Sequence, residues 1–189
     1  MRPKYIIVAG VNGSGKSTFY DTYPELFIDT KRINADEILK SNGGDWKKMS
    51  DNMKAMREVI QLMNQAIENH VSFHQETTLS GQGQKKWIEK AKQNGYEVTL
   101  LYVGIKDADL AVERVKQRVA KGGHGIPEET IRKRFQQSLK NLEIIAPLCD
   151  RVEFYDNTDS FISVYERKAD HIITTPPKNI EWIPDSFKE

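Results

Sequence analysis

The sequence contains a single cysteine, Cys149, among its 189 residues, which excludes an intramolecular disulfide. No stretch stays apolar over the length of a secretion signal or a membrane span. Both features predict a cytoplasmic protein with no membrane partner. No histidine lies near Cys149 in the sequence, so we expect this thiol to be buried and structural rather than nucleophilic.

The sequence also lacks an excess of charge of either sign, since 28 Lys and Arg residues are balanced by 27 Asp and Glu residues. A net charge of +1 provides no overall field that would attract nucleic acid, which is therefore disfavoured as a partner. The length and a hydrophobic content of 38% predict one domain over residues 1–189 that can bury a core without help.

What the sequence does contain is a phosphate-binding loop. Residues 10–17 match the pattern G-x-x-x-x-G-K-[ST] and directly follow the apolar run at residues 5–9. In such a loop the backbone N–H groups and the next helix bind phosphates, the lysine reaches the β- and γ-phosphates, and the hydroxyl after it binds Mg²⁺. The pattern predicts ATP and Mg²⁺ as ligands, with Ser17 on the metal. The predicted ATP contacts from this stretch are Gly10, Asn12, Gly13, Ser14, Gly15, Lys16, Ser17 and Thr18.

Polar residues follow several predicted strands. An apolar stretch from Leu26 leads to Asp36, and the alternating residues 71–76 lead to Glu76, Thr77 and Thr78. Ligands of open α/β sheets bind beyond the carboxyl ends of the strands, which makes Asp36 a candidate catalytic carboxylate. The alternative for Asp36 is a capping residue at the start of a helix.

Two further strands are predicted at residues 96–104 and 151–158. The first is the most strand-like run of the chain and is expected at the centre of the sheet. The second ends in a polar turn that in such folds lies beside the nucleotide base, which makes Asn157 a further predicted ATP contact. His74 alternates into an apolar neighbourhood and is expected to be a packed histidine.

An amphipathic helix is predicted from Trp46 to about Asn69. Its apolar positions recur every three or four residues, so we expect them to pack in the core, although methionines also suit an adaptable binding face. These positions are Met49, Met53, Met56, Ile60, Met63 and Ile67.

A lid is predicted at about residues 112–136. A helix carries Arg114 and Arg118 one turn apart, glycines interrupt the chain at residues 122–125, and a second helix carries Arg132 and Arg134. Arginines on both sides of a glycine hinge are typical of a lid that closes over a phosphate, although they could also be ordinary surface charges.

The order of these elements predicts an α/β fold with a doubly wound, parallel five-stranded sheet, a helical lid and a C-terminal β-hairpin with its tail at about residues 160–189. Two other classes of phosphate-loop protein, the GTPases and the AAA-type motors, are disfavoured. There is no Asn-Lys-x-Asp motif for guanine, and the strand at residues 100–104 continues into Gly-Ile-Lys rather than ending in the Asp-Glu of an AAA motor. A small-molecule kinase needs a carboxylate base and mobile arginines, which Asp36, Arg118 and Arg132 supply.

Four stretches together resemble the zeta-toxin-like P-loop kinases over about residues 4–158. They are the phosphate loop, residues 33–37, residues 73–81, and residues 114–118 followed by 122–127. Characterised members of that family phosphorylate the 3′-hydroxyl of UDP-N-acetylglucosamine. The resemblance therefore implies a P-loop kinase fold, transfer from ATP to a nucleotide sugar, and an antitoxin-like protein partner.

The resemblance also implies roles for residues. Asp36 corresponds to the base, Glu76 to a sugar-binding acid and Arg118 to a phosphate-contacting arginine. We assign Arg132 to catalysis and Arg114 to ATP binding. The predicted acceptor site is completed by Thr77, Thr78, His124 and Arg134. The family has a second phosphate-contacting arginine, and the candidates for its position here are His124, Arg132 and Arg134. Two alternatives stay open, namely a kinase for a nucleoside, sugar or polynucleotide end, and a non-catalytic module that ATP switches.

Overall fold

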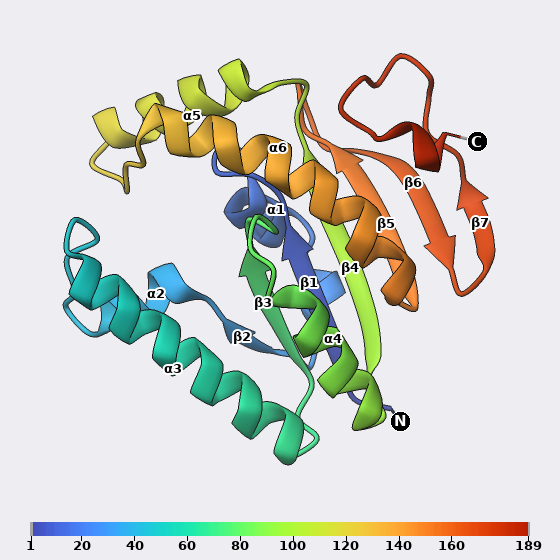
Figure 1. Ribbon diagram of the computed structural model, residues 1–189, viewed down its shortest axis with the longest axis horizontal. Coiled ribbons are helices and arrows are strands. Elements are labelled where there is room, and N and C mark those ends of the chain that lie inside the picture. Colours follow the sequence, from blue (N-terminus) through green and yellow to red (C-terminus); the bar gives the residue numbers. More distant parts are fainter. Residues whose placement is uncertain (1, 189) are drawn as a thin grey trace.

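A seven-stranded sheet forms the centre of the computed structural model, which describes residues 2–188 (Figure 1). The strand order is β2-β3-β1-β4-β5-β6-β7, and the first five strands along the chain run parallel. These strands are β1 (Lys4–Ala9), β2 (Lys31–Ile33), β3 (Phe73–Thr77), β4 (Glu97–Gly104) and β5 (Arg151–Asp156). The α/β, P-loop kinase-like fold is thus confirmed. The hairpin β6 (Ile162–Lys168) and β7 (His171–Thr174) is also present, and it extends the sheet because β6 pairs antiparallel with β5.

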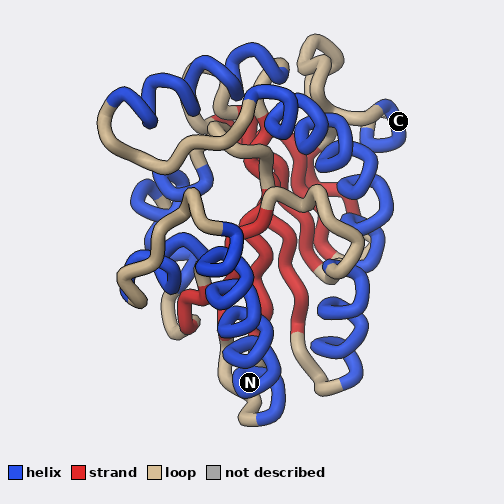
Figure 2. Tube along the Cα trace, turned by 60° about the vertical axis from the view of Figure 1, so that its left-hand side comes forward, coloured by secondary structure: helices blue, strands red, loops and turns tan. Residues whose placement is uncertain are grey.

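Helices cover both faces of the sheet, so β1 is buried from Tyr5 to Ala9 and reads as a continuous apolar run (Figure 2). The helices are α1 (Lys16–Thr22), α2 (Ala35–Ser41), α3 (Met49–Glu68), α4 (Gln84–Gln93), α5 (Ala108–Ala120) and α6 (Glu128–Ile145). One face packs against α2, α3, α4, α6 and the C-terminal tail, whereas the other packs against α1 and the 3₁₀ turn Pro24–Phe27. No helix of the described residues is long and apolar enough to cross a membrane.

Two predictions about local structure were wrong. The stretch from Leu26 to Asp29 is no strand: Pro24 starts a 3₁₀ turn that buries Phe27, and Asp29 turns the chain with a φ of 61° before the three-residue strand β2. The apolar row of α3 is only partly in the core. Met63 and Ile67 of the predicted row are buried, but Met49, Met53, Met56 and Ile60 are 45–79% exposed, because the line that faces the sheet runs through Ala55, Val59, Met63 and Ala66.

The lid helices lie beyond the carboxyl ends of β1 and β3 (Figure 1), and they have a small core of their own. Val112 and Val115 of α5 and Ile131 of α6 pack with Val11 of the phosphate loop. The two lid helices are therefore attached to the loop by apolar contacts, which places their polar side chains next to it. Cys149 is buried in the main core, and burial raises the pKa of its thiol to about 12, as expected for a structural thiol.

Candidate active site

The phosphate loop turns between β1 and α1 with almost no free space around its glycines. A side chain at Gly10 would collide with the carbonyl oxygen of Val103, and one at Gly15, where φ is +98°, would collide with Asn157. The Nζ of Lys16 donates hydrogen bonds to the carbonyl oxygens of Gly10 (2.7 Å) and Val11 (3.1 Å). The lysine therefore lies folded over the loop, where an incoming phosphate would be.

Four charged side chains act on Lys16. Its removal from water lowers the pKa of Lys16 to about 8; Glu76 and Asp36 oppose this shift, and Arg118 and Arg134 add to it. These four residues come from β3, α2, α5 and α6. The fold thus brings the charges of two carboxylates and two guanidinium groups near enough to act on the lysine, from segments up to about 120 residues apart in the sequence.

Glu76 lies at the end of β3, in register with Val8 of β1. Its Oε2 is 3.4 Å from the hydroxyl of Ser17, and its Oε1 is 2.5 Å from Nη2 of Arg32. The hydroxyls of Thr77 and Thr78, predicted to bind the acceptor, serve the turn after β3 by bonding to the backbone N–H of Leu79 and to Ser80. Glu76 is therefore the residue of this group whose side chain faces the phosphate loop.

Asp36 is in the first turn of α2 and its side chain is 73% exposed. The cap of this helix is Asn34, whose Oδ1 accepts from the backbone N–H groups of Asp36 (2.8 Å) and Glu37 (3.3 Å), so the capping alternative for Asp36 is wrong. Its Oδ1 is 3.7 Å from Nδ1 of His124 in the lid loop. Asp36 is thus an exposed carboxylate that faces the lid loop and whose charge acts on Lys16.

The predicted arginines of the lid divide into two groups. Arg134 donates to Oδ1 of Asn12 in the phosphate loop (3.0 Å), and Nε of Arg118 donates to the carbonyl oxygen of His124 (2.9 Å). Arg132, in contrast, pairs with Asp109 and Glu128 at 2.7 Å each on the lid surface. Arg134 therefore reaches the phosphate loop and Arg118 contacts the lid loop, whereas Arg132, predicted to be catalytic, is paired with two carboxylates away from the phosphate loop.

The remaining predicted ATP contacts brace the loop from the side of β5. Arg114 donates to the carbonyl oxygens of Asn157 and Thr158 (both 2.9 Å), and Nδ2 of Asn157 donates to the carbonyl oxygen of Ser14 (2.8 Å). Thr18 is exposed on the first turn of α1. These contacts attach α5 to the loop and leave Asn157 beside Gly15.

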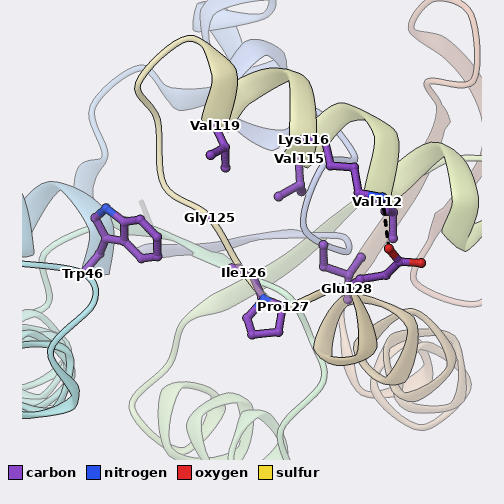
Figure 3. Close-up of a pocket in the computed structure, with 10 residues that line it drawn as sticks. Trp46, Val112, Val115, Lys116, Val119, Gly125, Ile126, Pro127 and Glu128 are labelled. Atoms are coloured by element: carbon purple, nitrogen blue, oxygen red, sulfur yellow. Dashed lines mark hydrogen bonds and ion pairs between the residues drawn. The ribbon is translucent and has the colours of Figure 1, made fainter.

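Sequence reasoning missed two residues of this region. Arg32 carries no local signal in the sequence, because the partner in its ion pair, Glu76, is 44 residues away. Trp46 lies against Gly125 of the lid loop, with its ring 5.6 Å from that of His124. Trp46 also closes one side of an apolar cavity of about 440 Å³ between α5 and the start of α6, and none of the predicted site residues lines this cavity (Figure 3).

Known proteins resemble this chain in sequence and in fold. The chain is 37% identical over 138 residues to an uncharacterized protein of Haemophilus influenzae, a match that covers 71% of this chain and 94% of the relative. A structure of the PezAT chromosomal toxin–antitoxin system of Streptococcus pneumoniae superposes with a TM-score of 0.64 at 19% identity, over 87% of this chain and 72% of the other. A chain of the AvrRxo1-ORF1:-ORF2 structure with ATP superposes with a TM-score of 0.75 at 13% identity, over 100% and 64%.

These two structural matches show a shared fold. The family model described as Zeta toxin matches residues 1–170, which is most of the sequence. The chain therefore belongs to the zeta toxin family.

Proposed function

We propose that this chain is an ATP-dependent kinase that transfers the γ-phosphoryl group to a hydroxyl group of a small molecule. The observation that carries the proposal is the set of charges that act on Lys16: the exposed carboxylate of Asp36, and the guanidinium groups of Arg118 and Arg134, the latter in contact with the phosphate loop. A site that only stored a nucleotide would have no need of a free carboxylate at this place. Kinases need one as a base, and they need cations where charge develops on the transferring group.

Each side chain has a role in this reaction. Lys16 binds the β- and γ-phosphates, and Arg118 and Arg134 stabilise the charge that develops on the oxygens of the transferring group. As the acceptor oxygen bonds to the γ-phosphorus, the bond to the oxygen of ADP breaks, and Asp36 takes the proton of the acceptor hydroxyl. ADP and a phosphate ester are the products.

Mg²⁺ fits the same site. The hydroxyl of Ser17 and Oε2 of Glu76, 3.4 Å apart, are the oxygen donors that this hard cation prefers, and most of its other ligands would be phosphate and water oxygens. When bound, the ion neutralises phosphate charge. Ser17 and Glu76 are thus the residues that we propose hold it.

For the acceptor we propose a nucleotide sugar such as UDP-N-acetylglucosamine, on the resemblance in residues 33–37 and 73–81. Asp36 would contact it, with His124 of the lid loop 3.7 Å from Asp36. We also propose an antitoxin-like protein partner. The PezAT match is a toxin–antitoxin system and the AvrRxo1-ORF1 match is a complex with ORF2, and a partner of this kind suits a family member with the same fold.

A substitution at Asp36 tests the proposal. ADP release is first measured against a panel of UDP-sugars, nucleosides, sugars and 5′-hydroxyl oligonucleotides, and the best acceptor is kept. Asp36→Asn should then lower acceptor-dependent transfer by ~10²-fold or more, because a general base typically contributes ~10²- to 10⁴-fold, while the Kd for ATP stays within a few-fold. Glu129→Gln, an exposed carboxylate in the first turn of α6, is the matched control and should leave both values unchanged.

Three results would count against it. Acceptor-dependent transfer that survives Asp36→Asn would remove Asp36 from catalysis. ATP binding without turnover on any acceptor would favour a nucleotide-switched module, and a preference for an acceptor other than a UDP-sugar would keep the kinase but replace its substrate.

A further inference from the structure

Arg32 connects three elements beneath the proposed active site. It lies on β2, where Nη2 is 2.5 Å from Oε1 of Glu76 on β3 and 3.1 Å from Oε1 of Glu37 on α2. Its guanidinium carbon is 4.1 Å from the ring centre of Tyr20 on α1, the helix that starts with Lys16 and Ser17. The guanidinium group therefore has a position fixed by two carboxylates and an aromatic face.

The ion pair with Glu76 is well removed from water. The side chain of Arg32 is 21% exposed and that of Glu76 is 11% exposed, whereas that of Glu37 is 54% exposed. A charge pair in such surroundings is strongly oriented, and loss of one partner leaves the other charge buried without compensation. Glu76 is thus the partner that depends most on Arg32.

The two oxygens of Glu76 have separate partners. Arg32 holds Oε1, and Oε2 is 3.4 Å from the hydroxyl of Ser17. A carboxylate free to rotate could offer either oxygen to the phosphate loop, or could turn toward the ammonium of Lys16. With Oε1 bound to Arg32, only Oε2 is available at Ser17.

We infer that Arg32 is a positioning residue, which holds Oε1 of Glu76 so that Oε2 stays beside Ser17, at the place where Mg²⁺ of a bound nucleotide would lie. This inference rests on the proposed function, because it assigns Glu76 to the metal side of that site. Groups that orient metal ligands typically contribute about 10- to 100-fold in metal affinity or activity. Arg32 makes no contact with the reacting atoms and acts through Glu76.

The chain contains a matched control for this arginine. Arg151 also lies on a strand, β5, and also joins two glutamates, Glu153 at 2.8 Å and Glu166 at 3.0 Å. Its side chain is 38% exposed and that of Glu153 is 7% exposed, which is close to the Arg32 pair. Arg151 lies at the start of β5, whereas the phosphate loop follows the end of β1. The main difference between the two arginines is that one glutamate of Arg32 lies beside the phosphate loop and the glutamates of Arg151 do not.

The experiment measures binding of a fluorescent ATP analogue with and without Mg²⁺ to the whole chain. Arg32→Met should reduce the gain in affinity that Mg²⁺ provides by about tenfold or more, with little change in the metal-free Kd. Glu76→Gln should do the same, and the double variant should lose no more than the larger single effect, because both changes remove one device. Arg32→Lys should restore part of the gain, since an ammonium can still hold Oε1.

Arg151→Met should lower the melting temperature and leave the Mg²⁺-dependent gain as in the wild type. Two results would overturn the inference: an Arg32→Met protein that keeps the full Mg²⁺-dependent gain in affinity, or a double variant in which the two losses of that gain add. Arg32→Gln replaces Arg32→Met if the latter does not fold, with the same expected loss. Because binding is read without turnover, a wild-type chain that transfers no phosphate would refute the proposed kinase activity and leave this result interpretable.

Discussion

Among single residues, His74 has the surroundings that predict a clear response to pH. Its side chain is 1% exposed on β3, stacks on Tyr20, packs at a tilt against Phe27, and bonds through Nδ1 to the hydroxyl of Thr30 (2.8 Å). Burial and, to a lesser extent, the charge of Arg32 lower the pKa of His74 to about 4. The packed histidine predicted from the sequence is thus buried and neutral at pH 7.

This shift makes His74 a source of acid sensitivity. Between pH 6.5 and 4 the unfolded chain binds a proton at His74 that the folded chain does not, so the free energy of unfolding falls as the pH falls through this window, by up to about 3 kcal/mol from this group. Urea unfolding of His74→Phe at pH 4.5 and 7 should show a smaller difference than the wild type. His171→Phe, on the exposed strand β7, should not change the difference, and an equal difference in all three proteins would contradict the assignment.

The sequence revealed residues whose chemistry is local and missed those whose role depends on packing. The phosphate loop could be predicted because backbone N–H groups and one lysine do its work. The choice between Arg132 and Arg134 could not, because they lie on different sides of α6 and only the packing of Ile131 against Val11 decides which side meets the loop. The ion pair of Arg32 with Glu76 was hidden for the same reason.

At the scale of elements, α3 shows what hydrophobic periodicity leaves undetermined. A period near 3.6 identified the helix, but its apolar arc is wider than the line that the sheet and α2 cover. The narrow line of Ala55, Val59 and Met63 is buried because it faces the sheet, and Met49, Met53 and Met56 are left exposed. Periodicity therefore predicted the helix and not its orientation.

The lid is the element for which we predict a change on binding. Two contacts hold the loop between α5 and α6: Nε of Arg118 donates to the carbonyl oxygen of His124, and Gly125 lies against Trp46. Neither contact is a hydrogen bond between two backbone groups. An ATP analogue with the acceptor should slow hydrogen exchange of residues 112–136 by about tenfold, because phosphates would engage Arg118 and Arg134.

Two variants separate this lid closure from general stabilisation. Arg134→Ala should abolish most of the added protection, since it removes the contact with Asn12 and the phosphates, whereas Arg132→Ala should keep it. Mass spectrometry of peptides from the lid and the phosphate loop provides the readout. If the loop became protected while exchange in the lid stayed the same, the lid would be a fixed part of the structure.

At the scale of the whole molecule, the tail after the hairpin is a structural part of the sheet's cover. Residues 176–188 return over β4, where Trp182 lies on Gly104, and the ring of Phe187 packs on Phe154 at 4.9 Å. The sequence predicted only a short tail here. The two prolines indicate where the hairpin ends, but they do not indicate that the following residues pack on the sheet. The match to the family ends at residue 170, before this cover begins.

Trp182 is the residue on which this cover depends most. It is 4% exposed, its indole N–H donates to Oδ1 of Asp156 (2.7 Å), and its ring stacks on Tyr102 at 5.6 Å. Trp182→Ala should lower the free energy of unfolding by about 3–5 kcal/mol, the usual cost of removing a large buried aromatic ring. Urea unfolding followed by circular dichroism measures this loss.

Two comparisons make the Trp182 result specific. Ile173→Ala on β7, where the side chain is 58% exposed, should change the free energy of unfolding by less than about 0.5 kcal/mol. In a folded Trp182→Ala protein at low temperature the Kd for ATP should stay within a few-fold, because Asn157 still bonds to Gly104 and Ser14 through groups that the substitution leaves in place. An unfolding midpoint equal to that of the wild type would mean that the tail is only an appendage, and a large loss of ATP affinity would mean that it helps to hold the phosphate loop.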